Sequence, residues 1–200
     1  MDERFYSKYK RVLEILPDVA ECTQKKFILV GGTALALFHL KHRISIDLDF
    51  VPLEGNAAKM KETLKGCLSR KGFRTSSGVY TNQFVIQFED TSIKVEVFIP
   101  DYKIKKFDEH SFGNAKLRVA SLDDIFEMKL QSYSERMEAR DLYDIIFILK
   151  SKKQGFEKIR ELIAKFGFPK NFGEIRNITL NEEDRDFFSK VIENASKAGN

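Results

Sequence analysis

The stretch that most limits how this chain can fold runs from Phe27 to Phe50, with the sequence FILVGGTALALFHLKHRISIDLDF. It reads as a short apolar strand, a two-glycine turn, a helical stretch and a second strand that carries two aspartates one residue apart. Side chains alternate along a strand, so Asp47 and Asp49 point to one face and their apolar neighbours to the other. Two carboxylates are therefore forced close together.

This pair of carboxylates favours a metal ion. Like charges at such a distance repel each other unless a cation lies between them, and hard carboxylate oxygens suit Mg²⁺ or Mn²⁺. Upstream, Gly31 and Gly32 allow the backbone to approach a phosphate, and Thr33 adds a hydroxyl. Arg43 and Ser45 stand between this turn and the aspartates. Phosphate on one side and a divalent ion on the other indicate nucleotide chemistry.

Each part of this pattern also has a simpler interpretation. A double glycine after an apolar strand is most often a tight turn, and an Asp-x-Asp pair often lies on a solvated edge or caps a helix. The conjunction favours the functional interpretation, because the aspartates lie inside an apolar strand and partly buried carboxylates need partners.

A third carboxylate, Glu96, lies in an alternating segment between Val95 and Val97. A charged group in such surroundings is unfavourable unless it meets a metal ion or another cation. An edge strand with Glu96 facing water is the alternative.

A second charged segment, KLQSYSERMEARDLYDI, covers residues 129–145. At about 100° per residue, one helical face would carry Lys129, Arg136, Arg140 and Asp144. One interpretation is a salt-bridged helix in which Arg140 and Asp144 form a favourable i,i+4 pair. The other is a line of cations that neutralises a triphosphate, as in phosphoryl-transfer enzymes.

On these residues the sequence resembles the polymerase-beta-like minimal nucleotidyltransferase superfamily, whose first motif is a Gly-Gly or Gly-Ser turn followed by D-x-D. Here the motif reads GGTALAL and then HRISIDLDF. Within the superfamily, the chain most resembles the AbiEii-type nucleotidyltransferases, known as toxins of type IV toxin–antitoxin systems. Their pattern K-x-x-A, R, R-D-x-x-D-L is matched in spacing by Lys129, Arg136, Arg140, Asp141 and Asp144. Ser132 replaces the alanine and Ile145 the leucine, and both changes are mild.

The resemblance implies a metal-dependent enzyme that moves a nucleoside monophosphate from an NTP to an acceptor hydroxyl. Asp47, Asp49 and Glu96 would bind Mg²⁺ or Mn²⁺, and Glu96, where many relatives have aspartate, would help deprotonate the acceptor. Asp141 and Asp144 would orient the neighbouring cations or touch the acceptor. The implied catalytic residues are Asp47, Asp49, Glu96 and Lys129. The implied nucleotide-binding residues are Gly31, Gly32, Thr33, Arg43, Ser45, Arg136, Arg140, Asp141 and Asp144.

For the acceptor, the resemblance implies RNA, in particular the end of a tRNA, with a cognate antitoxin as a possible partner. Related enzymes modify small molecules such as aminoglycosides or lincosamides, and others attach AMP to proteins, so these acceptors stay open. A catalytically silent nucleotide-binding module is an alternative from another class, although none of the three metal carboxylates is lost.

Composition sets the remaining limits. The 200 residues, with 42% hydrophobic content, suffice for a sizeable core. The net charge of +4 permits an anionic partner without demanding one. Cys22 and Cys67 are far apart in the sequence, so we expect reduced thiols in a cytoplasmic protein. The longest apolar run, residues 27–40, is shorter than the roughly twenty residues that a membrane span needs.

These patterns predict a mixed α/β (α+β) nucleotidyltransferase sheet flanked by helices and followed by a helical region. We expect an α/β core over residues 1–120 and a helical region packed on it over 121–200. The expected strands are 27–30, 46–51, 84–89 and 93–99. The expected helices are 3–16, interrupted at Pro17, then 56–71, 122–134, 139–150, 156–166 and 182–194, the last capped by Asn181.

Overall fold

The chain divides into a unit built on a β-sheet and a unit built of helices, in a computed structural model that describes residues 3–197. Of the described residues, the sheet unit comprises 3–34 and 45–121. The helical unit comprises residues 35–44 and 122–197. The segment between the glycine turn and the aspartates thus belongs to the helical unit, although sheet residues precede and follow it.

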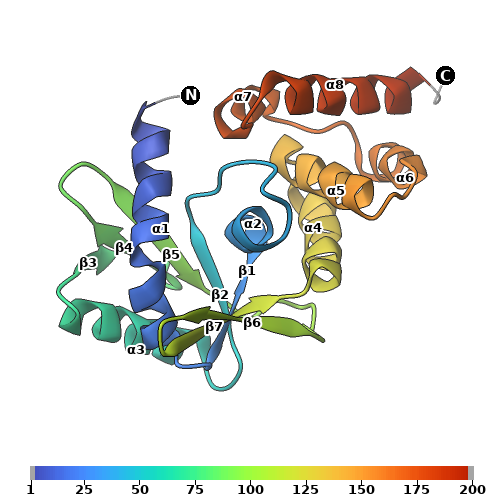
Figure 1. The fold of residues 1–200 in the computed structure, drawn as a ribbon. Helices are drawn as coiled ribbons and strands as arrows, with labels where there is room; N and C mark the ends of the chain where they lie inside the picture. The colour runs from blue at the N-terminus through green and yellow to red at the C-terminus, as the bar shows by residue number, and fades with distance from the viewer. Residues whose placement is uncertain (1–2, 198–200) are drawn as a thin grey trace. The chain divides into compact units, whose positions relative to one another are not determined.

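Within the described residues, seven strands form one sheet in the order β3-β4-β5-β2-β1-β7-β6 (Figure 1). β1 pairs with β7 and β2 pairs with β5 in parallel, whereas the other neighbours are antiparallel. The mixed sheet expected from the sequence is therefore confirmed. The strands are β1 (Phe27–Val30), β2 (Leu48–Pro52), β3 (Arg74–Ser77), β4 (Gln83–Gln87), β5 (Ser92–Val97), β6 (Phe107–Phe112) and β7 (Ala115–Ala120).

Three of these strands, β3, β6 and β7, were not predicted. β3 reads RTSS and is polar throughout, so it lacks the apolar alternation that marks a strand. β6 and β7 form a hairpin in which Phe112 pairs with Ala115 across a two-residue turn. The turn residues Gly113 and Asn114 are typical of such hairpins, and Gly113 has a φ of 60°.

Two helices, α1 (Glu3–Thr23) and α3 (Ala57–Arg70), pack on the sheet and on each other. α1 runs straight through Pro17, so the predicted interruption is wrong. A proline removes one helical hydrogen bond and weakens a helix by about 3 kcal/mol. Burial of Val12, Ile15 and Val19 on the side facing the core offsets that loss.

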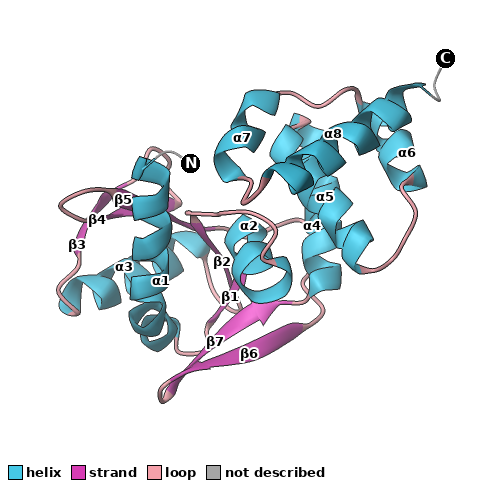
Figure 2. Cartoon of the chain, turned by 45° about the horizontal axis from the view of Figure 1, so that its top comes forward, coloured by secondary structure: helices cyan, strands magenta, loops and turns pink. Residues whose placement is uncertain are grey.

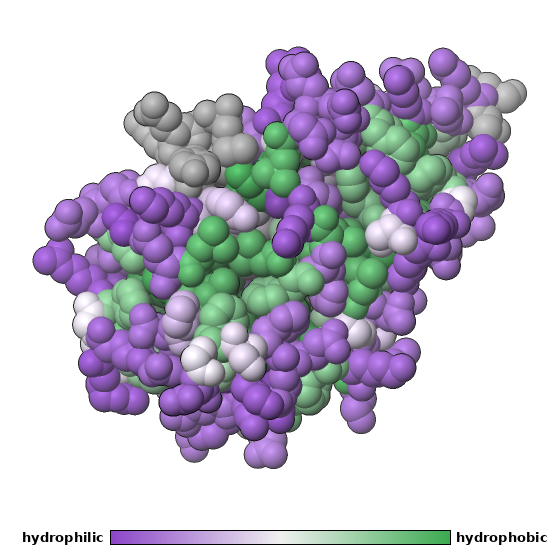
Figure 3. All heavy atoms as spheres, in the orientation of Figure 1, coloured by the Kyte–Doolittle hydropathy of each residue, from purple (hydrophilic) through white to green (hydrophobic). Residues whose placement is uncertain are grey.

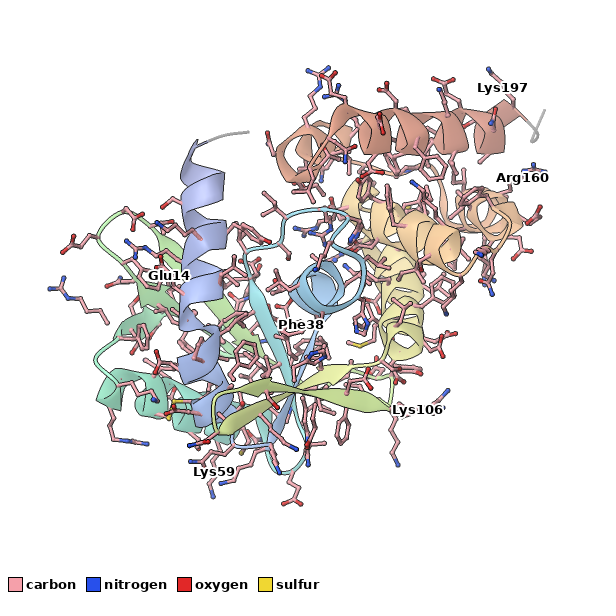
Figure 4. The ribbon with its side chains drawn as sticks, viewed as in Figure 1. Glu14, Phe38, Lys59, Lys106, Arg160 and Lys197 are labelled. Carbon is pink, nitrogen blue, oxygen red and sulfur yellow. A yellow bond between two sulfur atoms is a disulfide. The ribbon has the colours of Figure 1, made fainter. Side chains whose placement is uncertain are left out.

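The disulfide Cys22–Cys67 joins the end of α1 to α3, and it is the yellow bond between these helices in Figure 4. The expectation of reduced thiols, which rested on the separation of 45 residues, is contradicted. Separation along the chain does not limit distance in the fold, and the packing of α1 against α3 brings the two Cα atoms to 5.6 Å.

The core of the sheet unit follows from strand alternation. Leu48 and Phe50 of β2 are fully buried, as are Ile93, Val95 and Val97 of β5. Their neighbours in the sequence lie on the opposite face and are partly exposed. One face of the two strands therefore builds the core, and the other is available for chemistry.

The helical unit is centred on α5, whose residues from Leu142 to Leu149 are all buried. The rings of Tyr143 and Phe147 stack with centroids 4.5 Å apart, and Phe188 of α8 packs on Tyr143. Asn181 caps α8, as predicted, because its Oδ1 accepts the Asp184 amide at 2.8 Å. The helical elements, coloured cyan in Figure 2, are η1 (Leu35–Leu40), α4 (Leu122–Arg136), α5 (Ala139–Ser151), α6 (Glu157–Phe166), η2 (Phe172–Glu174), α7 (Ile175–Ile178) and α8 (Glu182–Lys197).

The outer side of α8 is polar, as the purple surface along this helix in Figure 3 shows. Its first turn carries Glu182, Glu183 and Asp184, where negative charge complements the helix dipole. Phe188, Val191 and Ile192 are buried on its other side. α8 is thus an amphipathic helix whose apolar stripe completes the helical unit.

Candidate active site

Three carboxylates lie on one face of the sheet unit, on the neighbouring strands β2 and β5 and on the residue just before β2. The parallel register places Asp49 directly beside Glu96. Asp47 comes one residue before β2 and two before Asp49, so it shares that face. The backbone thus brings together the three carboxylates that the sequence singled out as metal ligands.

Lys94 stands among these carboxylates. Its Nζ lies 3.1 Å from Asp47 Oδ2 and 3.9 Å from Glu96 Oε2. Burial acts to lower the pKa of Lys94, but the nearby carboxylates outweigh it and raise the pKa above its usual value. The ammonium is therefore charged at neutral pH and balances part of the negative charge.

Glu96 is held by two amide side chains from the start of β4. Asn82 Nδ2 donates to Oε1 and Gln83 Nε2 donates to Oε2, both at 2.8 Å. β5 lies between β4 and β2, so the alternative of Glu96 on a solvent-facing edge strand is wrong. Hydrogen bonds to both oxygens fix the orientation of this carboxylate.

The glycine turn lies against the second aspartate. Gly31 has a φ of +71°, and a Cβ at this position would lie 2.5 Å from Asp49 Oδ2. Only glycine combines this backbone conformation with so close an approach. Gly32 is buried beside it at the start of α2 (Gly31–Ala34).

Thr33 links this turn to the aspartate segment. Its Oγ1 lies 2.9 Å from Ser45 Oγ and donates to the main-chain oxygen of Asp47. The predicted residues Gly31, Thr33, Ser45 and Asp47 therefore form one connected group within the sheet unit. Thr33 holds the backbone next to Asp47, a role that the sequence did not indicate.

The donor set on this face fits a hard divalent ion, since three carboxylates occupy adjacent positions and a cation already lies between two of them. Among the described residues, however, no group of three His, Cys, Asp or Glu side chains is arranged to hold a metal ion as it stands. The Lys94 ammonium and the two amides of Asn82 and Gln83 occupy carboxylate oxygens that such an ion would use.

In the helical unit, several of the charged residues singled out by the sequence form a buried network around Asp144. Arg43 donates to both carboxylate oxygens, from Nε at 2.6 Å and from Nη2 at 2.8 Å. Lys129 Nζ lies 2.8 Å from Oδ2, and His42 Nε2 lies 2.8 Å from Oδ1. Burial acts to raise the pKa of Asp144, but Arg43 and Lys129 outweigh it and hold the pKa well below its usual value.

Asp141 is the second buried anion of this network. Its Oδ1 accepts from Lys129 Nζ at 2.9 Å, and its Oδ2 accepts from Arg136 Nε at 2.6 Å. Burial opposes its charge, yet Lys129 and Arg136 keep its pKa below the ordinary value. Lys129 thus bridges two carboxylates whose side chains have no solvent exposure.

The single helical face expected over residues 129–144 is wrong. α4 ends at Arg136, Met137 adopts a φ of 54°, and α5 begins at Ala139. Asp144 pairs with Arg43 and Lys129, and not with Arg140 as the interpretation of a salt-bridged helix proposed. The buried Nε of Arg140 has no hydrogen-bond partner among the described residues.

Four residues of these groups were missed by sequence reasoning: Lys94, Asn82, Gln83 and His42. Lys94 was recognisable, because it shares the alternation of Glu96 and stands two residues before it. The two amides and His42 carry no local signal. Burial acts to lower the pKa of His42, and its bond to Asp144 does not fully offset that effect.

The sequence model of a family described as nucleotidyl transferase AbiEii toxin, type IV TA system, matches residues 15–198. No curated protein matches the sequence. Within the described residues, every helix is too short or too polar to cross a membrane.

Several solved structures share the fold. JHP933 from Helicobacter pylori is 18% identical, with a TM-score of 0.57, over 99% of this chain and 94% of that one. A putative nucleotidyltransferase from H. pylori is 17% identical, with a TM-score of 0.56, over 99% and 97% of the two chains. An antigenic nucleotidyltransferase-like protein from Paracoccidioides brasiliensis is 15% identical, with a TM-score of 0.52, over 90% and 91%.

Proposed function

Because this chain belongs to the AbiEii nucleotidyl transferase toxin family of type IV toxin–antitoxin systems, we propose that it is a metal-dependent enzyme that uses an NTP to modify tRNA. The reaction joins the α-phosphate of the NTP to an acceptor hydroxyl and releases pyrophosphate. A toxin of this kind requires a cognate antitoxin as its partner. The observation that carries the proposal is the group formed by Asp49 and Glu96 on adjacent strands and by Asp47, which shares the cation Lys94 with Glu96.

These three carboxylates are the residues that would hold Mg²⁺ or Mn²⁺. When bound, the divalent ion neutralises charge on the phosphates and favours ionisation of the acceptor hydroxyl. Glu96 is suited to accept the proton of that hydroxyl, because Asn82 and Gln83 fix its two oxygens.

The glycine turn is suited to the triphosphate. Gly31 and Gly32 have no side chain that would keep a phosphate from the backbone amides. Thr33 and Ser45 then serve to hold the turn beside Asp47. In this proposal the turn orients the NTP, and the carboxylates act on its α-phosphate.

In the helical unit, Arg140 is the cation best suited to bind a phosphate group. Its buried Nε lacks a hydrogen-bond partner among the described residues, and a buried donor without a partner is unfavourable. Arg136 is 46% exposed in its side chain, so it is the second candidate. Arg136 is held by Asp141, which belongs to the buried network together with Lys129, Arg43 and Asp144.

The test is an incubation of the purified protein with each α-³²P-labelled NTP, Mg²⁺ and total tRNA. Label on tRNA with one of the nucleotides would support the proposal. Parallel reactions replace tRNA with an aminoglycoside or with a protein extract. Label on either of these acceptors and none on tRNA would replace the tRNA acceptor with a small molecule or a protein.

The toxin role has its own test. Induced expression of the wild-type chain should arrest growth, and expression of the gene next to it should restore growth. Expression of the Asp49→Asn protein at the same level is the control. Unimpaired growth with wild-type protein that is active on tRNA would refute the toxin role and leave the enzyme assignment intact.

A further inference from the structure

Lys94 belongs to a block of four charged side chains on one face of the sheet. The register places Val95 beside Leu48 and Glu96 beside Asp49, so Lys94 comes opposite Asp47. Strand alternation then directs all four side chains to the same side. The block contains three anions and one cation.

The cation lies where a metal ion would be needed. Lys94 Nζ contacts Asp47 Oδ2 at 3.1 Å and comes within 3.9 Å of Glu96 Oε2. An ammonium and a divalent ion seek the same carboxylate oxygens, and both cannot occupy one place. Two of the three proposed metal ligands are therefore in contact with a cation that belongs to the protein.

The members of the block differ in their freedom to move. Glu96 is fixed by the amides of Asn82 and Gln83. Asp49 lies against the backbone of Gly31. The Lys94 side chain is 38% exposed, and its charge ends a flexible four-carbon stem. Lys94 is thus the member that can leave without disturbing the strands.

We propose that Lys94 is a built-in competitor of the divalent ion: its ammonium holds Asp47 and Glu96 when no metal is bound and is displaced when the metal binds. The inference rests on the proposed function, because it takes these carboxylates as metal ligands. Without a cation the carboxylates would repel one another, so Lys94 also stabilises the metal-free sheet.

Displacement leaves the ammonium in need of an anionic partner. A phosphate group of the NTP has the required charge, and lysine is a common phosphate ligand. Metal alone therefore binds weakly, and metal together with NTP binds well. This arrangement ties metal binding to the arrival of the nucleotide.

The experiment measures Mn²⁺ binding without nucleotide, by the electron paramagnetic resonance signal of the free ion. Wild type is compared with Lys94→Met, which removes the charge, and with Lys94→Arg, which keeps it. Lys94→Met should bind Mn²⁺ at least about tenfold more tightly than wild type, because the competing cation is gone. Lys94→Arg should stay within about threefold of wild type. Lys94→Gln replaces the methionine variant if that protein does not fold.

The double variant Asp47→Asn/Lys94→Met tests whether the tighter Mn²⁺ binding of Lys94→Met depends on Asp47. We expect the double variant to bind Mn²⁺ without that increase in affinity. Equal Mn²⁺ affinity in wild type and Lys94→Met, with weaker binding in Asp47→Asn, would overturn the competition and leave the proposed metal site standing. Absence of Mn²⁺ binding in all these proteins would overturn the inference together with the metal dependence of the proposed function.

Discussion

Arg43 and Asp144 form a two-point ion pair inside the helical unit, with Nε 2.6 Å from Oδ1 and Nη2 2.8 Å from Oδ2. The Asp144 side chain has no solvent exposure, and that of Arg43 is 5% exposed. Arg43 lies in the segment 35–44, which belongs to the helical unit although sheet residues precede and follow it, and Asp144 lies in α5. This ion pair therefore joins the segment 35–44 to the rest of the helical unit.

Removal of Asp144 should therefore destabilise the protein strongly. Asp144→Ala leaves the charge of Arg43 buried without its carboxylate partner and leaves Lys129 with Asp141 alone. We expect a loss of about 3–5 kcal/mol in the free energy of unfolding. Denaturant titration measures it. Glu161→Ala is the matched control, because Glu161 and its partner Lys158 are largely exposed. A similar small change in both variants would refute the structural role of the network.

Stability should fall as the pH drops from about 7 to 5, and His42 should be the cause. Its folded pKa is lowered below 6.5, first by burial and then by the charges of Arg43 and Lys129. Below about pH 6.5 the unfolded chain binds a proton that the folded chain does not, so acid favours unfolding. Asp141 and Asp144 lower the stability only at more acidic pH, because their folded pKa values lie below 3.8.

His42→Gln tests this directly, since glutamine keeps a donor for Asp144 but does not titrate. Its stability should be nearly constant between pH 7 and pH 5, whereas His39→Gln should show the wild-type loss. Chemical unfolding at several pH values gives both curves. An unchanged slope in His42→Gln would assign the acid sensitivity to other groups.

Gly31→Ala should impair both stability and catalysis. The φ of +71° alone costs an alanine about 1–3 kcal/mol, and the Cβ would also lie 2.5 Å from Asp49 Oδ2. Gly113→Ala is a close control, because its φ is +60° and nothing lies within 4 Å of the added Cβ. Both variants should lose stability, and only Gly31→Ala should lose nucleotidyl transfer. Full activity in Gly31→Ala would show that Asp49 tolerates displacement.

Reduction of the Cys22–Cys67 disulfide should lower the free energy of unfolding by about 2–4 kcal/mol, because the bond closes a loop between residues 45 apart in the unfolded chain. Unfolding with and without dithiothreitol measures the difference. The free energy of unfolding of the Cys22→Ala/Cys67→Ala protein should not change when dithiothreitol is added. Equal loss of stability in that variant would mean that the reductant acts elsewhere.

The mixed sheet was predictable because its central strands carry strong local patterns. Apolar residues surround Asp47 and Asp49, and alternation around Glu96 is regular. β3 was not predicted because its four polar residues lie at the edge of the sheet and form a strand only by pairing with β4. The continuation of α1 through Pro17 likewise depends on packing that a local rule does not include.

The contacts of the buried charged network could not be predicted from local sequence patterns. Lys129 and Asp144 lie on different helices, and their contact depends on the break between α4 and α5, where Met137 has a positive φ. Methionine gives no signal of such a conformation, because this backbone region is more typical of glycine and asparagine. The partners Arg43 and His42 are about one hundred residues away in sequence, so their roles follow only from the fold.

The central claim is that the carboxylates on β2 and β5 carry out nucleotidyl transfer, and label transfer from an α-³²P-labelled NTP to tRNA tests it most directly. Wild type is compared with Asp47→Asn and Glu96→Gln, and each reaction is repeated with EDTA. Asp108→Asn, an exposed aspartate on β6, is the control.

We predict that Asp47→Asn and Glu96→Gln lose at least about a hundredfold in rate with their circular dichroism spectra unchanged, since metal-assisted stabilisation of the transition state amounts to several kcal/mol. EDTA should abolish the wild-type reaction, and Asp108→Asn should behave as wild type. Full transfer by Asp47→Asn, or by wild type in EDTA, would contradict the account.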